Sequence, residues 1–198
     1  MTPAAPAFPR LETARLVLSV PERGDAPRLL AYNERNRSHL RPFSPPEPKG
    51  TCELEFWRTF AARLQRDFLA GVSVPFRIAL RDDPTGPFIG GATLSQIFGG
   101  PFSACYLGYH LDFERVGQGI MTEALSAVIA HAFEVRRLHR LMANYVPHNA
   151  RSARVLARLG FSIEGYAREY LFIDGAWRDH VLTSLTNRAL SAPSDSGR

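Results

Sequence analysis

Two glycines and the residues around them could bind an anion. Gly117 and Gly119 follow an apolar stretch typical of a buried strand and precede apolar residues at helical spacing. Glycine permits a sharp turn there, which leaves backbone amides uncovered at the start of the helix. Those amides and the positive end of the helix dipole favour the same ligand. The sequence therefore predicts a phosphate or diphosphate site at residues 116–120, although a Gly-x-Gly pair alone is also typical of a plain tight turn.

Two well-known nucleotide sites do not fit this turn. A Walker loop requires Gly-Lys-Ser/Thr, whereas Ile120 and Met121 follow Gly119. A dinucleotide-binding fingerprint requires a third glycine three residues after the second, and position 122 is a threonine. A different kind of phosphate-binding turn remains.

A second polar pair, Asn149 and Ser152, lies three residues apart at the start of another predicted helix. An asparagine side chain in this position accepts a hydrogen bond from an amide of the first turn, and the helix would end at Gly160. From the residues alone, Asn149 is an N-cap and Ser152 is a first-turn serine.

The composition is that of an ordinary globular protein. The chain has 198 residues, of which 45% are hydrophobic and 22% charged, which suits one domain with an ample core. The formal net charge of +5 fits a solvated basic surface, a polyanionic cofactor or an RNA-rich particle. No apolar run reaches the length of a membrane span and no signal-peptide pattern opens the chain, so we expect a cytoplasmic protein that does not contact a membrane.

Cysteine and histidine give no sign of a metal. Cys52 and Cys105 are far apart and fit no metal-ligand spacing, so we expect two buried thiols in a reducing compartment. The six histidines form no ligand-type cluster, and no metal site is expected.

The periodicity predicts a mixed sheet with helices on its faces. Asp25 and Thr51 are the expected N-caps of the first two helices. The expected core is residues 11–188, with 1–10 and 189–198 extended or frayed. The predicted elements are a strand over 14–20, helices over 26–36 and 52–68, strands over 73–81, 88–98 and 103–111, a helix over 120–133, a strand over 141–146, a helix over 150–159, and strands over 161–173 and 176–186.

Residues 108–186 resemble the GNAT superfamily of acetyl-CoA-dependent N-acetyltransferases, and within it the RimJ/RimL-type ribosomal-protein-alanine N-acetyltransferases. The stretches that carry the resemblance are Val-Gly-Gln-Gly-Ile-Met-Thr-Glu-Ala at 116–124, Leu-His-Arg-Leu-Met-Ala-Asn-Tyr at 138–145, Pro-His-Asn-Ala-Arg-Ser at 147–152, Arg-Leu-Gly-Phe at 158–161, Glu-Gly-Tyr-Ala at 164–167, and Ile-Asp-Gly-Ala-Trp-Arg-Asp-His at 173–180. Arg15 and Leu16, together with residues 102–106, fit the RimJ branch in particular.

The resemblance implies one GNAT domain over residues 1–198, of the α+β class. Its mixed, mostly antiparallel sheet would have about seven strands, splayed between the fourth and the fifth, with helices on both faces. Acetyl-CoA would be the cofactor, with its pantetheine arm paired to the open strand edge. The implied cofactor-binding residues are Tyr109, His110, Leu111, Arg115, Val116, Gly117, Gln118, Gly119, Ile120, Asn144, Asn149 and Ser152.

The chain departs from the family at two positions. Val116 stands where glutamine or arginine is usual, which implies weaker cofactor binding. Leu156 stands where many members have a tyrosine that protonates the leaving thiolate. The RimL-type alternative is a serine at the position of Ser152, which we therefore expect to donate a hydrogen bond or proton to the sulfur.

The acceptor amine must lose a proton, since an α-amino group has a pKa of about 7.7–8.0. An ordered water or a modest base suffices. Glu169, Glu164 and His110 are the candidates, and Glu169 is the one expected on the acceptor side. Each could equally be a surface charge or a strand-end residue.

The function implied is direct transfer of an acetyl group, through a ternary complex, to the N-terminal alanine of a small-subunit ribosomal protein. Association with the ribosome or its precursor is a possible consequence, and the protein would be a monomer or homodimer. Acetylation of a small amine or an antibiotic is one alternative. A ribosome-assembly or RNA-associated factor with vestigial catalysis is another.

Overall fold

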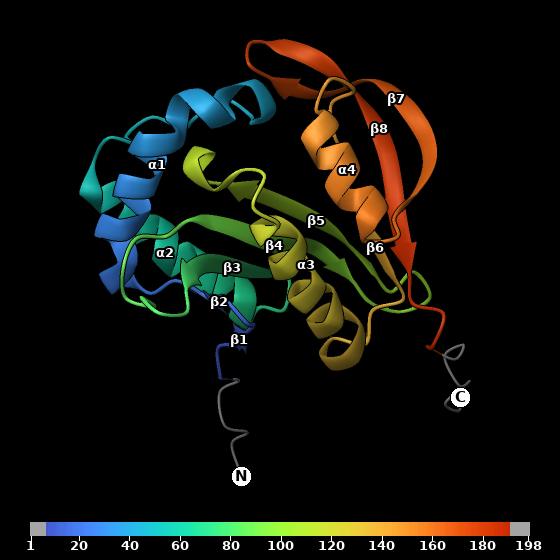
Figure 1. Cartoon of the computed structure of the whole chain (residues 1–198), viewed down its shortest axis with the longest axis horizontal. Coiled ribbons are helices and arrows are strands. Elements are labelled where there is room, and N and C mark those ends of the chain that lie inside the picture. Colours follow the sequence, from blue (N-terminus) through green and yellow to red (C-terminus); the bar gives the residue numbers. More distant parts are fainter. Residues whose placement is uncertain (1–6, 191–198) are drawn as a thin grey trace.

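The computed structural model describes residues 7–190, and all strands of this part form one sheet in the order β1-β2-β3-β4-β5-β6-β8-β7 (Figure 1). Every neighbouring pair is antiparallel except β5–β6, which is parallel. The strands are β1 Arg10–Glu12, β2 Leu16–Ser19, β3 Ser73–Leu80, β4 Gly90–Phe98, β5 Ala104–Leu111, β6 Arg140–Met142, β7 Ser162–Ile173 and β8 Ala176–Thr186. The helices are α1 Ala26–Leu40, α2 Leu54–Leu69, α3 Ile120–Ala130 and α4 Ala150–Arg158.

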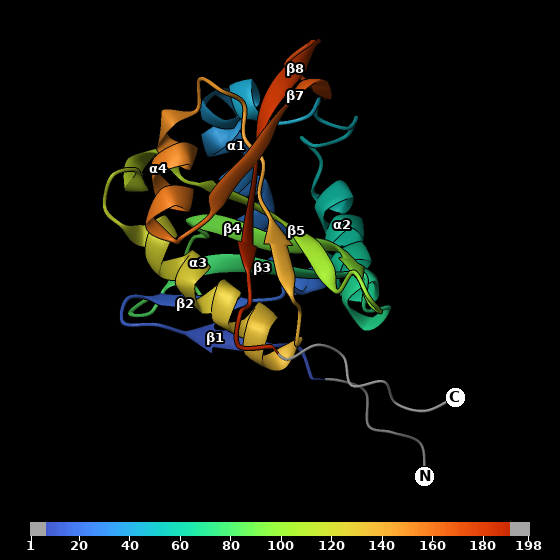
Figure 2. The ribbon, with the colours of Figure 1, turned by 90° about the vertical axis from the view of Figure 1, so that its right-hand side faces the viewer.

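Helices cover both faces of the sheet (Figure 2). On one face, α1 and α2 pack together and bury Leu29 and Trp57 in a cluster with Ala79 of β3. On the other face, α3 buries Leu125 against the larger core, which includes Ile78. Alternate residues of β3 therefore serve the two cores, as the two-residue period of a strand requires. The predicted fold class, a mostly antiparallel mixed sheet with helices on both faces, is confirmed.

The sheet has one strand more than the predicted seven. β1 pairs with β2 through Arg10–Ser19, Leu11–Leu18 and Glu12–Val17. A turn at Thr13, whose amide donates to the Leu16 carbonyl, brings the two strands together. The sequence around these residues is rich in Pro and Ala and predicts an extended tail. This composition gives no sign of the three-residue edge strand β1.

Two further predictions near α2 are wrong. The helix begins at Leu54 with Glu53 as its N-cap, rather than at Cys52 after Thr51. The Thr51 carbonyl accepts a hydrogen bond from the Trp57 indole at 2.9 Å, and its hydroxyl donates to Glu47 at 3.1 Å. These contacts bury Thr51, whereas Cys52 is exposed, so only Cys105 is the expected buried thiol.

The remaining boundary differences are small. The first helix continues four residues beyond the predicted end at Asn36, to Leu40. The third helix ends at Ala130 and is followed by a π-helical turn, His131–Val135, where a plain helix to residue 133 was expected. Asp25 occupies the N-cap position of α1, but its carboxylate accepts the Glu22 amide of the preceding turn.

The sheet opens between β5 and β6, as expected for the fourth and fifth predicted strands. The two strands pair only from Ala104–Arg140 to Tyr106–Met142. The chain after Met142 turns toward β8, where Tyr145 forms an isolated bridge with Val181. The predicted strand over 141–146 is therefore shorter than expected, and the last residues of β5 have no strand partner on this side within residues 7–190.

The β7–β8 hairpin arches from the far side of this opening toward the C-terminal end of α1 (Figure 1). Its turn, Asp174–Gly175, has positive φ angles of 45° and 77°, as the Asp-Gly pair predicts. The Asp174 carboxylate accepts a hydrogen bond at 2.7 Å from Arg41, in the short 3-10 turn η2 (Arg41–Phe43). The opening is thus enclosed by two segments that are far apart in the sequence.

No helix within residues 7–190 is both long and apolar enough to span a membrane. The predicted extended ends fall largely on residues 1–6 and 191–198, which lie outside the described part of the chain. The single-domain assignment of residues 1–198 stays a prediction.

Candidate active site

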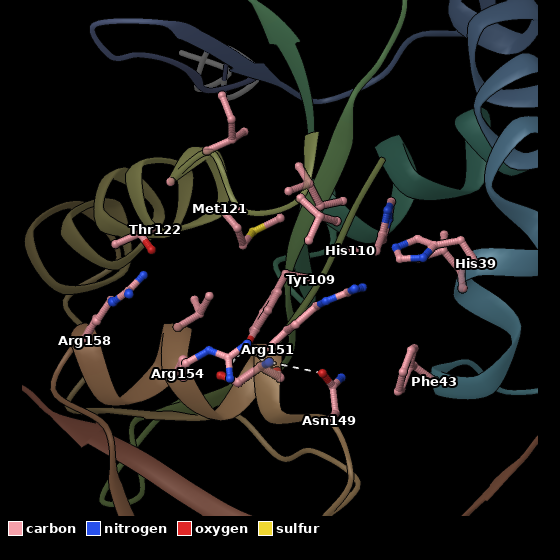
Figure 3. Close-up of a pocket in the computed structure, with 18 of the residues that line it drawn as sticks. His39, Phe43, Tyr109, His110, Met121, Thr122, Asn149, Arg151, Arg154 and Arg158 are labelled. Atoms are coloured by element: carbon pink, nitrogen blue, oxygen red, sulfur yellow. Dashed lines mark hydrogen bonds between the residues drawn. The ribbon is translucent and has the colours of Figure 1, made fainter. Parts of the chain in front are cut away.

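A cavity of about 350 Å³ occupies the opening beside β5 (Figure 3). The end of β5 and the glycine loop form one wall, and α4 forms the facing wall. The end of α1 and η2 close it through His39 and Phe43. The cavity therefore joins the two sequence motifs that were predicted to carry chemistry, the glycine turn and the Asn149 helix.

The glycine loop has the geometry of an anion site. Gly117 and Gly119 have φ angles of 83° and 74°, and Gly119 is the N-cap of α3. Both glycines line the cavity. The amides of Gly117, Gln118 and Gly119 donate no hydrogen bond to any group in the described chain, and those of the first turn of α3 have no intrahelical partner. These amides are available to an anion in the cavity.

Asp112 fixes the chain where it leaves β5 for this loop. One oxygen of its buried carboxylate accepts the Glu114 amide at 3.0 Å. The other accepts Arg35 at 2.7 Å and Asn36 at 3.1 Å, both from α1. Burial alone would raise the pKa of Asp112, but the hydrogen bonds from Asn36, Glu114 and Arg35 outweigh it and hold the pKa below its usual value. The carboxylate stays charged and ties α1 to the loop.

Glu123, in the first turn of α3, anchors the loop from the other side. Its carboxylate accepts the Thr13 hydroxyl at 2.6 Å and both the amide and the guanidinium of Arg15, at 2.9 and 2.6 Å. Arg15 also donates to the Gln118 carbonyl at 3.0 Å. The segment between β1 and β2 therefore holds both the loop and the start of α3.

Three polar side chains meet at the start of α4. Asn149 caps the helix, and its side-chain oxygen accepts the Ser152 amide at 3.1 Å. The Ser152 hydroxyl is 2.5 Å from the hydroxyl of Tyr109, which reaches across from β5. Burial raises the pKa of Tyr109 to about 12, despite the opposing effect of the hydrogen bond to Ser152. Tyr109 thus remains a protonated donor at neutral pH.

The structure brings most of the predicted cofactor-binding residues to the cavity wall. Those that line it are Tyr109, His110, Leu111, Val116, Gly117, Gly119, Ile120, Asn149 and Ser152. Three others do not line it. Arg115 and Gln118 belong to the loop, where the Gln118 amide group donates to the Glu114 carbonyl at 2.8 Å. Asn144 donates instead to the Tyr170 hydroxyl at 3.0 Å. The binding role of each residue stays a prediction.

The two candidate carboxylate bases lie outside the cavity wall. Glu164 is ion-paired with Arg140, and that hydrogen bond lowers the pKa of Glu164. Glu169 is exposed, in a bulge of β7, with a positive φ of 48° and its amide bonded to Asp179 at 2.9 Å. A positive φ strains the backbone of a residue other than glycine, and such strained residues are common at functional sites.

His110 is the weakest of the three candidate bases. Its Nδ1 is 2.7 Å from the Tyr32 hydroxyl, and the ring lies over Gly91, where a Cβ would be 2.7 Å from Nε2. Burial, and then the charge of Arg77, lower the pKa of His110 to about 3. An imidazole with this pKa is neutral but too weak to deprotonate an α-ammonium group efficiently.

The depressed pKa of His110 predicts an acid-sensitive fold. Above pH 6.5 both folded and unfolded states hold a neutral His110, and the stability is complete. As the pH falls from 6.5 toward about 3, only the unfolded state takes up the proton, so stability is lost. His110→Gln removes this titrating group. We therefore expect the slope of unfolding free energy against pH to be smaller in the variant than in the wild type, by up to about 1.4 kcal/mol per pH unit. Urea unfolding of both proteins between pH 8 and pH 4.5 measures this, and parallel curves would contradict it.

Sequence reasoning missed several residues of the cavity wall. Arg151, Arg154 and Arg158 of α4 line it, and their spacing of three and four residues was a visible signal. His39 and Phe43 also line it. The residues next to His39 and Phe43 in the sequence give no sign of a binding site. The packing of α1 and η2 beside the opening brings these two side chains to the cavity.

Comparisons with known proteins identify the family. Residues 15–162 match the model described as "Acetyltransferase (GNAT) domain". The [Ribosomal protein uS5]-alanine N-acetyltransferase of Escherichia coli (strain K12) is 44% identical over 177 residues, or 89% of this chain and 90% of that protein. The ribosomal-protein-S5-alanine acetyltransferase of Vibrio fischeri, a crystal structure, has a TM-score of 0.86 at 36% identity and covers 92% of this chain and 99% of its own. The chain belongs to the GNAT acetyltransferase family.

The residues of the cavity fit coenzyme A. A second solved structure, Mycobacterium smegmatis RimJ in complex with CoA-disulfide, has a TM-score of 0.83 at 29% identity over 94% of this chain and 90% of its own. In the present structure, uncovered loop amides and the arginines of α4 line a cavity beside an open strand edge. These groups suit phosphates and the amides of a pantetheine arm. The protein is an N-acetyltransferase that uses acetyl-CoA.

Proposed function

We propose that this protein acetylates the N-terminal alanine of ribosomal protein uS5. The observation that carries the proposal is the 44% identity, spread over nearly nine-tenths of both chains, to the Escherichia coli enzyme of that name. The match includes both walls of the cavity. The enzyme is then a ribosomal-protein-alanine N-acetyltransferase. It acts in the cytoplasm, close to the ribosome or its precursor.

The residues of the cavity divide the work of transfer between them. When bound, acetyl-CoA supplies a thioester whose carbonyl carbon is open to attack by an amine. The loop amides at 116–120 hold the diphosphate, and the free edge of β5 at 109–111 pairs with the pantetheine amides. A backbone amide of that edge also polarises the thioester carbonyl. Asn149 fixes the start of α4 and so the position of Ser152.

Proton transfers complete the reaction. The Ser152 hydroxyl donates a proton to the departing sulfur, and Tyr109, 2.5 Å away, can replace it. On the acceptor side, Glu169, directly or through a water molecule, removes the proton of the α-ammonium group. Transfer is direct, from thioester to amine, with both substrates bound.

The proposal predicts a preference for one kind of N-terminus. A peptide with the first residues of the cognate uS5, beginning with alanine, is expected to be acetylated once, at its α-amino group. We expect kcat/KM to fall about tenfold or more when serine replaces the first residue, because an acceptor site that selects alanine would leave the added hydroxyl without a hydrogen-bond partner. Mass spectrometry of the products measures both effects.

An N-terminally blocked copy of the peptide is the control and should not react. Acetylation of small free amines with no reaction of the peptide would favour a small-molecule acetyltransferase. Coenzyme binding with no transfer to any amine would favour an assembly factor. Either result would overturn the proposal.

A further inference from the structure

The side chains of Arg151, Arg154 and Arg158 share one face of α4 and point toward the cavity from the same wall (Figure 3). Among the residues that the structure describes, none of the three has a carboxylate within 4.0 Å. Other arginines near the cavity, such as Arg15 and Arg35, are paired. A row of unpaired cations on the wall of a cavity favours an anionic ligand.

Stability of the helix does not account for this row. Like charges three and four residues apart on a helix repel each other. Arg151 lies in the first turn, where the helix dipole disfavours a positive charge, and only Arg158 lies near the favourable end. The arrangement is unfavourable until an anion binds.

The three arginines line different parts of the cavity. Burial and the charge of Arg151 lower the pKa of His39, which places Arg151 toward the end formed by α1. The Arg158 side chain extends toward Thr122, in the first turn of α3, and Arg154 lines the cavity from the preceding turn of α4 (Figure 3). Arg158 and Thr122 lie at the opposite end of the cavity from Asn149 (Figure 3), and Thr122 follows the glycine loop in the chain.

Coenzyme A carries two separate phosphate groups. Its diphosphate links the pantetheine arm to the ribose, and a monoester phosphate is attached to the ribose 3′ oxygen. The loop amides suit the diphosphate, and the adenosine must then lie beyond them, away from the thioester. We propose that Arg154 and Arg158 bind the 3′-phosphate and make the enzyme select coenzyme A over its 3′-dephospho form. Guanidinium groups suit a phosphate monoester because their paired donors match its oxygens.

Isothermal titration of the full-length protein with coenzyme A and with 3′-dephospho-coenzyme A tests this proposal. We expect the wild type to bind coenzyme A about tenfold more tightly than the dephospho form, a ratio typical of charge-assisted contacts at an exposed site. The double variant Arg154→Gln/Arg158→Gln should bind both ligands with affinities within about twofold, because its affinity falls only for the ligand that has the phosphate. The preference of the wild type should also shrink as salt is raised.

Arg63→Gln/Arg66→Gln is the matched control. These two exposed arginines lie on α2, and the substitution removes the same net charge far from α4. The control should keep the tenfold preference. Equal binding of both ligands by the wild type would overturn the proposal, as would an equal loss for both ligands in the α4 variant. The proposal depends on the coenzyme and not on the acceptor, so failure to acetylate the uS5 peptide would leave this result unchanged.

Discussion

Replacing Gly119 with valine is expected to lower the affinity for coenzyme A about 100-fold. The residue is the N-cap of α3 and has a φ of 74°, in a region that β-branched side chains avoid. Valine would shift the turn and move its uncovered amides away from the diphosphate. Loss of two charge-assisted hydrogen bonds of about 1.5 kcal/mol each corresponds to about this change in affinity. Isothermal titration with coenzyme A measures it.

Gly71→Val separates this effect from general strain. Gly71 has the same φ of 74°, and its added Cβ would have only an Arg136 nitrogen nearby, at 3.9 Å. At Gly119 the corresponding neighbour is an Arg15 nitrogen at 3.6 Å. Both variants should lose about 1–2 kcal/mol of unfolding free energy, but only Gly119→Val should lose affinity. If both variants bind coenzyme A as tightly as the wild type, the loop amides do not hold the diphosphate.

The parts of the site that sequence could predict are those set by neighbouring residues. The positive φ angles of Gly117 and Gly119 follow from the Gly-x-Gly pair. The Asn149 cap follows from an asparagine three residues before Ser152. Each feature needs only a few residues of local chain, and local conformational preference is what a sequence pattern records.

The contacts that complete the site join distant segments and could not be predicted this way. Tyr109 and Ser152 are 43 residues apart, and Arg35 and Asp112 are 77 apart. Arg41 and Asp174, which close the opening, are 133 residues apart. The choice among many possible partners depends on the whole sheet. The same applies to Thr51, whose contact with Trp57 overrode its preference for an N-cap.

Leu156 shows how the two kinds of information combine. Many GNAT enzymes have a tyrosine at this position, whereas Leu156 is buried in the core. From the sequence, the loss of that tyrosine left Ser152 as the sole candidate donor. The structure adds a different tyrosine, Tyr109, whose hydroxyl approaches the same turn of α4 from β5. The Tyr109 hydroxyl can therefore supply a proton near Ser152, which the leucine at position 156 cannot do.

Ser152→Ala is therefore expected to lower kcat about 100-fold, within the range of general acid catalysis, and to leave the affinity for coenzyme A within about twofold. Tyr109→Phe removes only a hydroxyl group and should lower kcat by a smaller factor. The double variant should be no slower than Ser152→Ala, since Tyr109 acts through the serine. Initial rates at saturating substrate and titration with coenzyme A measure the two quantities.

Ser126→Ala is a suitable control, because Ser126 is an exposed serine of α3 whose hydroxyl, within residues 7–190, bonds only to the Thr122 carbonyl, at 2.9 Å. It should leave kcat unchanged. If Ser152→Ala has the same kcat as the wild type, the sulfur departs without help from α4. If the two single variants instead lower kcat independently and their effects multiply, Tyr109 does not act through Ser152, and the short contact between their hydroxyls only positions the start of the helix.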